Sequence, residues 1–359
     1  MTPKERILSA IQGKPVDRVP WCPFLAYWWE KQPESFREQG QLAFMEAIGA
    51  DPLLRGIPGV AWRVEFKGTN FRNETRGEEM ENIYETPVGT LRERYIHSPE
   101  GDTWFLVGHA VKIEEDYKIL QWMYEHAVVH NEPEVLNQNL REIGNRGLGI
   151  SVVGPTHKSA FQSLVEQYVG TQELSFALFD FPETVEACLE AMRQVSYKTA
   201  EISVESDAEV FIFFEDSSTT NISPAMFEKY TMPEIDTWGR IIHGADKLLL
   251  HHACGHVKGL LPHMSQLPLD GIESMSPPPT GNISYAEARP QLPGNIALIG
   301  GIEPTIFEKC TMEELEQNVY QLLHDMKGTR FVLANSDSCP PGVSMEKWKA
   351  IAGWVKKYS

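Results

Sequence analysis

The chain has 359 residues, of which 42% are hydrophobic and 10% aromatic, so it has ample material for a large buried core. Charged residues make up 23%, a profile that excludes intrinsic disorder, collagen and coiled coil. The formal net charge is −18, and a chain this acidic is a poor candidate for binding nucleic acid, which needs clustered cations.

The first predicted element is a helix that starts after Thr2 and ends at Gly13. Thr2 and Glu5 have the spacing of a capping box, Pro3 suits the first helical position, and Gly13 suits the C-terminal cap. Further on, short apolar runs alternate with segments of helical periodicity. Helices are also expected to open at Pro182, Ser223 and Thr311.

Eight apolar segments are predicted strands: Arg18–Phe24, Asp51–Gly56, Gly149–Gly154, Glu209–Phe214, Lys247–His252, Gly271–Met275, Ile296–Gly300 and Arg330–Ala334. Several are apolar on both faces, which is typical of parallel strands covered on both sides. Eight such strands alternating with helices predict an α/β protein, a (β/α)8 TIM barrel formed by residues 1–359 as one domain. A doubly wound open sheet is the alternative.

One N-terminal region departs from this alternation. Residues 85–112 have the pattern of antiparallel strands separated by turn residues. We therefore expect an antiparallel β insertion over residues 75–125 beside the barrel. It would serve as a lid or as the contact surface of a homodimer.

The expected location is cytoplasmic, with no membrane partner. No apolar stretch approaches the roughly 20 residues that span a bilayer. The first residues lack the apolar core of a signal peptide. The cysteines are odd in number and thinly spread, which favours free thiols, metal ligands or catalysis over a disulfide framework. They are Cys22, Cys188, Cys254, Cys310 and Cys339.

The strongest chemical feature is a cluster of His and Cys directly after the apolar run Leu248–Leu250. His252 and Cys254 are two positions apart, so their side chains share a face if the strand continues. Cys339 follows the last predicted strand, and in a barrel the C-terminal ends of strands carry the active site. These three residues are predicted ligands of a catalytic zinc ion with an open fourth position. The alternative is that the cysteines are ordinary core residues.

Carboxylates near these strand ends are candidates for the fourth position or for catalysis. Glu273 and Glu215 are the candidate fourth ligands. Glu215 and Asp216 follow the most apolar strand, a place that suits substrate contact, proton transfer or metal support. The alternative is that they are solvated loop acids that cap the next helix.

Aromatic and imidazole side chains also follow predicted strands. Tyr27, Trp28 and Trp29 come after the first strand and are predicted to form an aromatic wall for a flat apolar substrate. Core packing is the alternative for these three residues. His157 ends another predicted strand and is expected to line the same mouth and bind substrate.

Several short motifs, taken in their order and spacing, resemble the uroporphyrinogen decarboxylase superfamily over essentially the whole chain. They are Pro3–Leu8, Gly13–Pro20, Gly154–Pro155, Asp180–Glu183, Ile222–Pro224 and Gly300–Pro304. The resemblance implies a TIM barrel. Porphyrinogen decarboxylases of this family carry an arginine-rich segment after the first strand, which binds the carboxylates of their substrate. Residues 23–30 contain no arginine here, and together with the acidic charge this disfavours decarboxylation.

The other branch of the superfamily comprises corrinoid-dependent methyltransferases, including the methylcorrinoid:coenzyme M enzymes. Their zinc site is a His-x-Cys after one strand and a Cys after the last, and this sequence matches at His252, Cys254 and Cys339. The branch's glutamate ligand aligns near Met275, where no carboxylate stands. Glu273, two positions earlier, is the expected substitute.

The resemblance implies a zinc-dependent methyltransferase that acts between a small substrate and the cobalt of a corrinoid. The expected methyl donor is a methoxylated aromatic, and Glu215, Asp216 and His251 would orient it or handle a phenolic proton. The chain lacks an Asp-x-His-x-x-Gly corrinoid signature, so the corrinoid is expected on a partner protein. A metal-free decarboxylase-type lyase and a noncatalytic small-molecule-binding protein are the alternatives.

Overall fold

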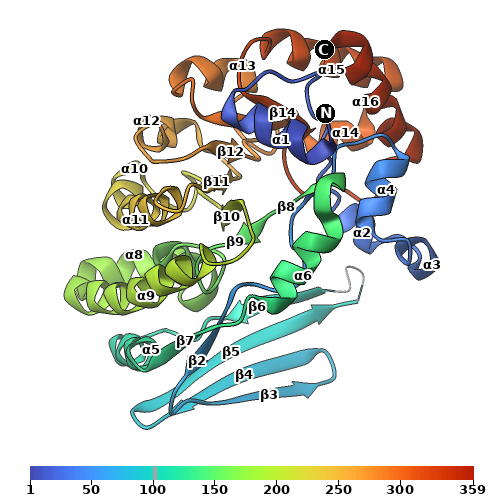
Figure 1. Ribbon diagram of the computed structural model, residues 1–359. Helices are drawn as coiled ribbons and strands as arrows, with labels where there is room; N and C mark the ends of the chain where they lie inside the picture. Colours follow the sequence, from blue (N-terminus) through green and yellow to red (C-terminus); the bar gives the residue numbers. More distant parts are fainter. Residues whose placement is uncertain (100–102) are drawn as a thin grey trace. The chain divides into compact units, whose positions relative to one another are not determined.

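The structure is a computed structural model that describes residues 1–99 and 103–359 (Figure 1). It divides into two units. The first unit comprises Met1–Val60, Pro133–Val152 and Val204–Ser359, and the second comprises Ala61–Glu132 and Val153–Ser203. Within the described part of the chain, no helix combines the length and the apolar character needed to cross a membrane.

The strands and helices of the first unit alternate along the chain, as the sequence predicts. Its strands are β1 (Leu53–Leu54), β8 (Leu148–Gly149), β9 (Ser151–Val152), β10 (Val210–Glu215), β11 (Leu248–Ala253), β12 (Gly271–Glu273), β13 (Ala297–Ile302) and β14 (Phe331–Asn335). Its α-helices are α1 (Pro3–Gln12), α2 (Tyr27–Glu30), α3 (Glu34–Arg37), α4 (Gln41–Ala47), α6 (Glu134–Ile143), α10 (Pro224–Met226), α11 (Met232–His243), α12 (Leu261–Met264), α13 (Tyr285–Ala288), α14 (Pro304–Lys309), α15 (Met312–Asp325) and α16 (Met345–Tyr358).

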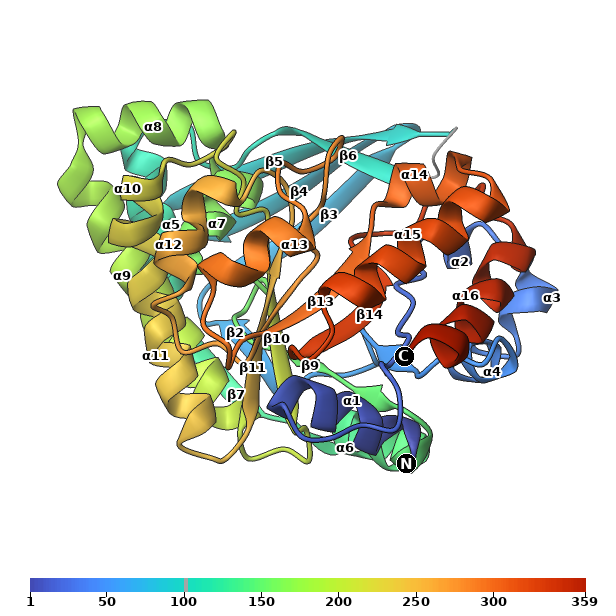
Figure 2. The ribbon, with the colours of Figure 1, turned by 90° about the horizontal axis from the view of Figure 1, so that it is seen from above.

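The strands of the first unit close into a parallel barrel (Figure 2). β9 to β14 form one six-stranded sheet, and β1 pairs with β8, which continues into β9. The segment around Trp21 closes the ring. The Cys22 amide donates to the Leu333 carbonyl in β14 (2.8 Å), and the Asp51 amide, just before β1, donates to the Trp21 carbonyl (2.7 Å). The eight predicted strands thus form the predicted (β/α)8 barrel, which excludes the open-sheet alternative.

Helix boundaries of the first unit follow the capping signals in the sequence. The Thr2 hydroxyl accepts from the Glu5 amide, and Gly13 ends α1 in the left-handed conformation at φ +71°. A second capping box at Thr311 opens α15. The buried side chains of Ile7 and Ile11 then join α1 to the apolar core that fills the barrel. Local capping and burial therefore agree on where this helix starts and which face it buries.

The second unit is built around antiparallel strands. β3 (Asn70–Arg76), β4 (Glu79–Thr86), β5 (Gly89–Ser98) and β6 (Thr103–Gly108) form one sheet in chain order, and β2 (Trp62–Phe66) pairs with β7 (Ala127–Asn131). Its helices are α5 (Glu114–Glu125), α7 (Ala160–Ser163), α8 (Thr171–Asp180) and α9 (Pro182–Ser203). The antiparallel strands therefore extend beyond the expected range 75–125 at both ends. β2 and β7 lie far apart in sequence, so no local turn signal reveals their pairing.

A buried carboxylate ties α1 to the barrel. Asp51 is fully buried and accepts hydrogen bonds from Arg6 (2.5 Å), from Arg18 (2.6 Å) and from the Trp21 amide (3.0 Å). Arg6 also donates to Asp17, which lies at the surface. A charge taken out of water needs such partners, because its desolvation costs several kcal/mol. Asp51 thus joins α1, the Trp21 strand and the start of β1.

We expect Asp51→Ala to lower the free energy of unfolding by about 3–5 kcal/mol. The substitution removes the carboxylate that compensates the positive charges of Arg6 and Arg18 inside the protein. Asp17→Ala is the control. Asp17 also pairs with Arg6, but its side chain is 44% exposed, so its loss should cost less than about 1 kcal/mol. Urea denaturation at neutral pH measures both changes. Equal losses in the two variants would contradict this account.

Candidate metal centre

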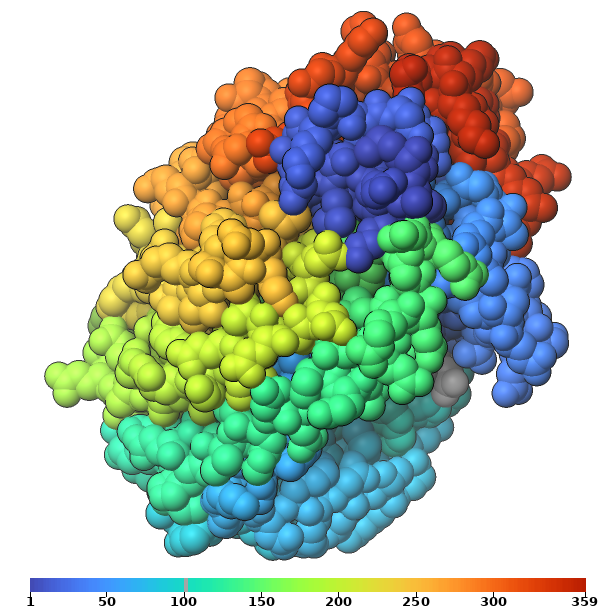
Figure 3. All heavy atoms as spheres, viewed as in Figure 1, coloured from blue at the N-terminus to red at the C-terminus, as the bar shows by residue number. Residues whose placement is uncertain are grey.

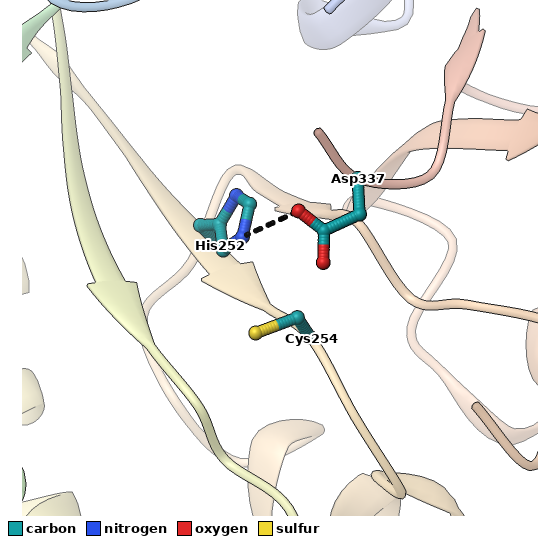
Figure 4. Close-up of side chains that lie close together, drawn as sticks. All are labelled: His252, Cys254 and Asp337. Carbon is teal, nitrogen blue, oxygen red and sulfur yellow. Dashed lines mark ion pairs between the residues drawn. The ribbon is translucent and has the colours of Figure 1, made fainter. Parts of the chain in front are cut away.

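Three potential metal ligands meet at the C-terminal ends of β11 and β14. His252 lies in β11, Cys254 directly follows that strand, and Asp337 lies two residues after β14. One donor atom from each lies within 4.8 Å of the other two. Figure 4 shows the three side chains close together, and His252 Nε2 lies 4.0 Å from Asp337 Oδ1. Among the described residues this is the one such group of three found.

The position of His252 and Cys254 follows from strand geometry. β11 is apolar up to His251 and buried from Leu249 onward, as expected of a strand in the barrel wall. Side chains two apart on an extended strand share a face, which brings these two donors together. Gly255 turns the chain immediately afterwards at φ +80°. A Cβ there would lie 2.8 Å from Asp216 Oδ1, so the turn requires glycine.

Glu273 orients the imidazole of His252. The two residues are register partners in the parallel pair β11–β12, and Glu273 is 1% exposed. Glu273 Oε2 lies 3.1 Å from His252 Nδ1. An ionised carboxylate can only accept, so Nδ1 carries the proton and donates it. The lone pair of Nε2 then faces Asp337, which is the orientation a metal-binding histidine needs.

Arg55 keeps Glu273 ionised. This residue is not among the site residues predicted from the sequence. Its Nε donates to Glu273 Oε1 (2.6 Å), and its Nη2 forms an ion pair with the same oxygen. Burial raises the pKa of Glu273, but the charge of Arg55 and the hydrogen bond from His252 outweigh it and lower that pKa to about 2. Phe24 packs under the Arg55 guanidinium at 4.6 Å and meets the His252 ring edge-on at 6.0 Å.

The loop after β14 positions Asp337. The Asn335 side-chain amide donates to the carbonyls of Phe24 (2.8 Å) and Asp337 (2.6 Å). It thereby fixes the loop to the segment that follows Trp21. The Ser338 amide donates to Asp337 Oδ1 (2.6 Å). These contacts place the carboxylate beside His252. In the sequence, the polar run Asn335–Asp337 directly after a predicted strand is the pattern that could have identified Asp337 as a site residue.

The donor set suits zinc. Imidazole nitrogen, thiolate sulfur and carboxylate oxygen are the usual zinc ligands, and in tetrahedral geometry they lie about 3.3–3.7 Å apart. The observed separations, up to 4.8 Å, are close enough for side-chain rotation to reach that geometry. Three protein donors leave a fourth position open, which is typical of catalytic rather than structural sites.

The structure places two of the predicted ligands outside this group. Cys339 is fully buried, its carbonyl accepts from the Trp28 amide (2.9 Å), and its thiol contacts the Pro340 carbonyl (3.5 Å). Burial raises the pKa of this thiol. Asp337, from the same loop, occupies the third-ligand position that was predicted for Cys339. Glu273 faces Nδ1 of His252 and not the open position, so here it supports a ligand.

The side chain of His251, a predicted catalytic residue, does not face the metal site. It alternates with His252 along β11, so its ring points to the other face and stacks on Phe213 at 4.4 Å. Its Nε2 lies 3.0 Å from the Ser217 hydroxyl. Burial and the adjacent His252 lower its pKa to about 3, so it is neutral at neutral pH. His251 is fully buried, and its predicted catalytic role stays a prediction.

The two carboxylates after β10 take different positions. Glu215 is buried at the end of the strand, and its carbonyl lies 3.7 Å from Cys254 Sγ. Asp216 is partly exposed, accepts a hydrogen bond from the Asn221 amide (2.6 Å) and borders the Gly255 turn. Asp216 is therefore the carboxylate of this pair that has access to solvent beside Cys254.

Two of the three aromatic residues of the predicted wall are buried in the core. Trp28 and Trp29 are buried against Phe44, and the Trp28 indole donates to the Val343 carbonyl (2.7 Å). This packing agrees with the core-packing alternative, and a role of these two residues in substrate binding stays a prediction. Tyr27 is 60% exposed.

His157 belongs to the second unit. It has a positive φ of +63° and meets Trp62 edge-on at 6.4 Å. Burial and the neighbouring Lys158 lower its pKa. Its predicted role in substrate binding stays a prediction.

Comparison with known proteins identifies the family. The profile of the uroporphyrinogen decarboxylase (URO-D) family matches residues 160–358, more than half of the chain, so this protein belongs to that family. A comparison with curated proteins finds no match.

Among solved structures, the chain is similar to a methyltransferase from Methanosarcina mazei. The identity is 15% and the TM-score 0.64, over 100% of this chain and 99% of that one, which shows a shared fold. A Listeria monocytogenes protein provisionally described as a vitamin-B12-independent methionine synthase matches 63% of this chain and 69% of its own. Its identity is 12% and its TM-score is 0.39, which is too low to show a shared fold.

We expect Arg55→Met to destabilise the protein by about 3–5 kcal/mol, because it leaves Glu273 buried without its cation. Glu273→Gln in the same chain removes the unpaired charge, so the double variant should be more stable than the sum of the single effects predicts. Urea denaturation of the four proteins in a double-mutant cycle measures this coupling. The exposed Arg37→Met is the control. Additivity within about 0.5 kcal/mol would contradict the pairing.

Proposed function

We propose that this protein is a zinc-dependent methyltransferase that acts between a small substrate and the cobalt of a corrinoid on a separate protein. The observation that carries the proposal is the convergence of His252, Cys254 and Asp337, with Glu273 behind His252. Membership of the URO-D family and a similar fold described as a methyltransferase support the same direction.

The residues of the chain would prepare the site in three ways. His252, Cys254 and Asp337 would bind the metal, and Glu273 would hold the proton on Nδ1 so that Nε2 remains a donor. When bound, zinc supplies a Lewis acid that lowers the pKa of an acceptor thiol or polarises the oxygen of a methyl ether. The open fourth position is where the substrate heteroatom would bind.

A methoxylated aromatic is the donor we propose. The methyl group would pass to cobalt(I), whose electron pair forms the new bond, while the aryl oxygen leaves with the pair of the broken C–O bond. Asp216, solvent-accessible beside the Gly255 turn, is the residue we assign to the phenolic proton. Glu215 would help to hold the position of Cys254 through its carbonyl.

Purified protein should contain about one zinc ion per chain, measured by elemental analysis without chelators. His252→Ala and Cys254→Ala should abolish binding, and Glu273→Gln should weaken it by about 10–100-fold because the imidazole loses its orienting partner. Cys310→Ala is the matched control, since Cys310 has intermediate burial like Cys254 but lies elsewhere.

The third ligand is distinguished in the same experiment. Asp337→Ala should lose zinc and Cys339→Ala should keep it if the arrangement in Figure 4 is the binding one. The opposite result would show that the loop turns to present Cys339, as the family resemblance implies. No zinc in the parent protein after reconstitution would overturn the proposed site and favour the metal-free lyase or the noncatalytic binder.

Activity is tested with methoxyarenes and a separately purified corrinoid protein reduced to cobalt(I). We expect methyl transfer to cobalt, followed by its absorbance change and by release of the phenol. Asp216→Asn should lower the rate by about 10²–10⁴-fold, the range of a lost proton-transfer group, without loss of zinc. Activity on a porphyrinogen instead would contradict the proposal.

A further inference from the structure

A cavity lies at the opposite end of the barrel from the metal centre. Its volume is about 690 Å³. The end of α1, the start of β14, the turn before it and the loop before β13 line it, so it opens at the N-terminal ends of the strands. In Figure 3 the dark-blue start of the chain lies against orange and red segments from later in the sequence.

The charged side chains that line this cavity are all cationic. They are Lys14, Arg289, Lys327 and Arg330, and among the described residues no Asp or Glu side chain lines it, although the last residue of the sequence, Ser359, does. Acidic residues outnumber basic ones by 50 to 32 in the chain, so this separation of charge runs against the composition. Within residues 1–99 and 103–359, none of the four cations forms an ion pair. The cavity therefore presents four cationic side chains that no described acidic side chain pairs with.

The two arginines are held side by side by backbone carbonyls. Arg289 donates to the Ile296 carbonyl (2.7 Å), and Arg330 donates to the carbonyl of the adjacent Asn295 (2.9 Å). The pKa of Arg289 lies below its ordinary value, because the side chain is partly buried and Arg330 is near. Two close guanidiniums repel each other, and a bound anion relieves that repulsion.

Apolar side chains complete the cavity. Val16, Leu292, Met326 and Phe331 line it together with the ring of Tyr358. Its volume falls within the range of about 300–1,000 Å³ that is typical of small-molecule sites. An inorganic anion would leave this apolar wall uncovered. An organic molecule with a flat or apolar body and several negative charges matches both parts of the lining.

We propose that this cavity binds an organic phosphate of the nucleotide class, with its phosphates between the four cations and its body on the apolar wall. Planar guanidinium groups recognise phosphate oxygens in a bidentate manner, and lysines add point charge. The proposal is independent of methyl transfer, because its residues lie outside the metal centre.

The test is isothermal titration calorimetry of the full chain with ATP and with pyrophosphate, in buffer without divalent cations. ATP should bind more tightly than pyrophosphate, because only ATP covers the apolar wall. Lys14→Gln combined with Lys327→Gln should weaken ATP binding by about tenfold or more, since each lysine supplies a charge-assisted contact. Neither side chain forms a hydrogen bond or an ion pair with the described residues, so the variant should melt like the parent.

Lys309→Gln combined with Lys349→Gln is the control, because it makes the same change in net charge at exposed positions outside the cavity. This control should leave ATP affinity within about twofold. Several results would overturn the proposal: no binding of ATP at millimolar concentration, equal weakening by both double variants, or pyrophosphate bound as tightly as ATP. Binding of a single-stranded oligonucleotide in place of ATP would overturn it too. Zinc content, measured on the same samples, keeps this test separate from that of the metal centre.

Discussion

The ion pair between Arg55 and Glu273 is the interaction on which the candidate site depends. A carboxylate that is 1% exposed would take up a proton if it had no cation beside it. Arg55 keeps it ionised, so it accepts the Nδ1 proton of His252 and leaves Nε2 as a donor. One buried charge pair thereby decides the protonation and the direction of the residue at the centre of the proposed zinc site.

The barrel distributes different chemistry to its two ends. At the C-terminal ends of the strands, His252, Cys254 and Asp337 present nitrogen, sulfur and oxygen donors. At the N-terminal ends, Asp51 compensates Arg6 and Arg18, but the cavity there presents four cationic side chains that form no ion pair with a described Asp or Glu. A closed parallel barrel permits this division, because all its strands point the same way and the two ends share no loops.

Much of the barrel could be predicted because its signals are local. Apolar runs such as Val210–Phe214 identify buried parallel strands wherever they lie, and the Thr2–Glu5 capping box sets a helix start by itself. The pairing of His252 with Cys254 is also local, since it needs only the two-residue period of a strand. The same period, applied to His251, explains why this residue had to turn away from the site.

The sequence by itself determined the strands, the capped helices, the URO-D resemblance and one pair of neighbouring donors, all of which depend on residues close in the chain. Only the tertiary structure decided which distant residues complete the site. Glu273 meets His252 through the register of β11 and β12, and Arg55 reaches Glu273 across 218 positions. Asp337, and not Cys339, faces the site because Asn335 fixes the loop. Strand register and loop clamps join residues distant in sequence, so no local pattern reveals them.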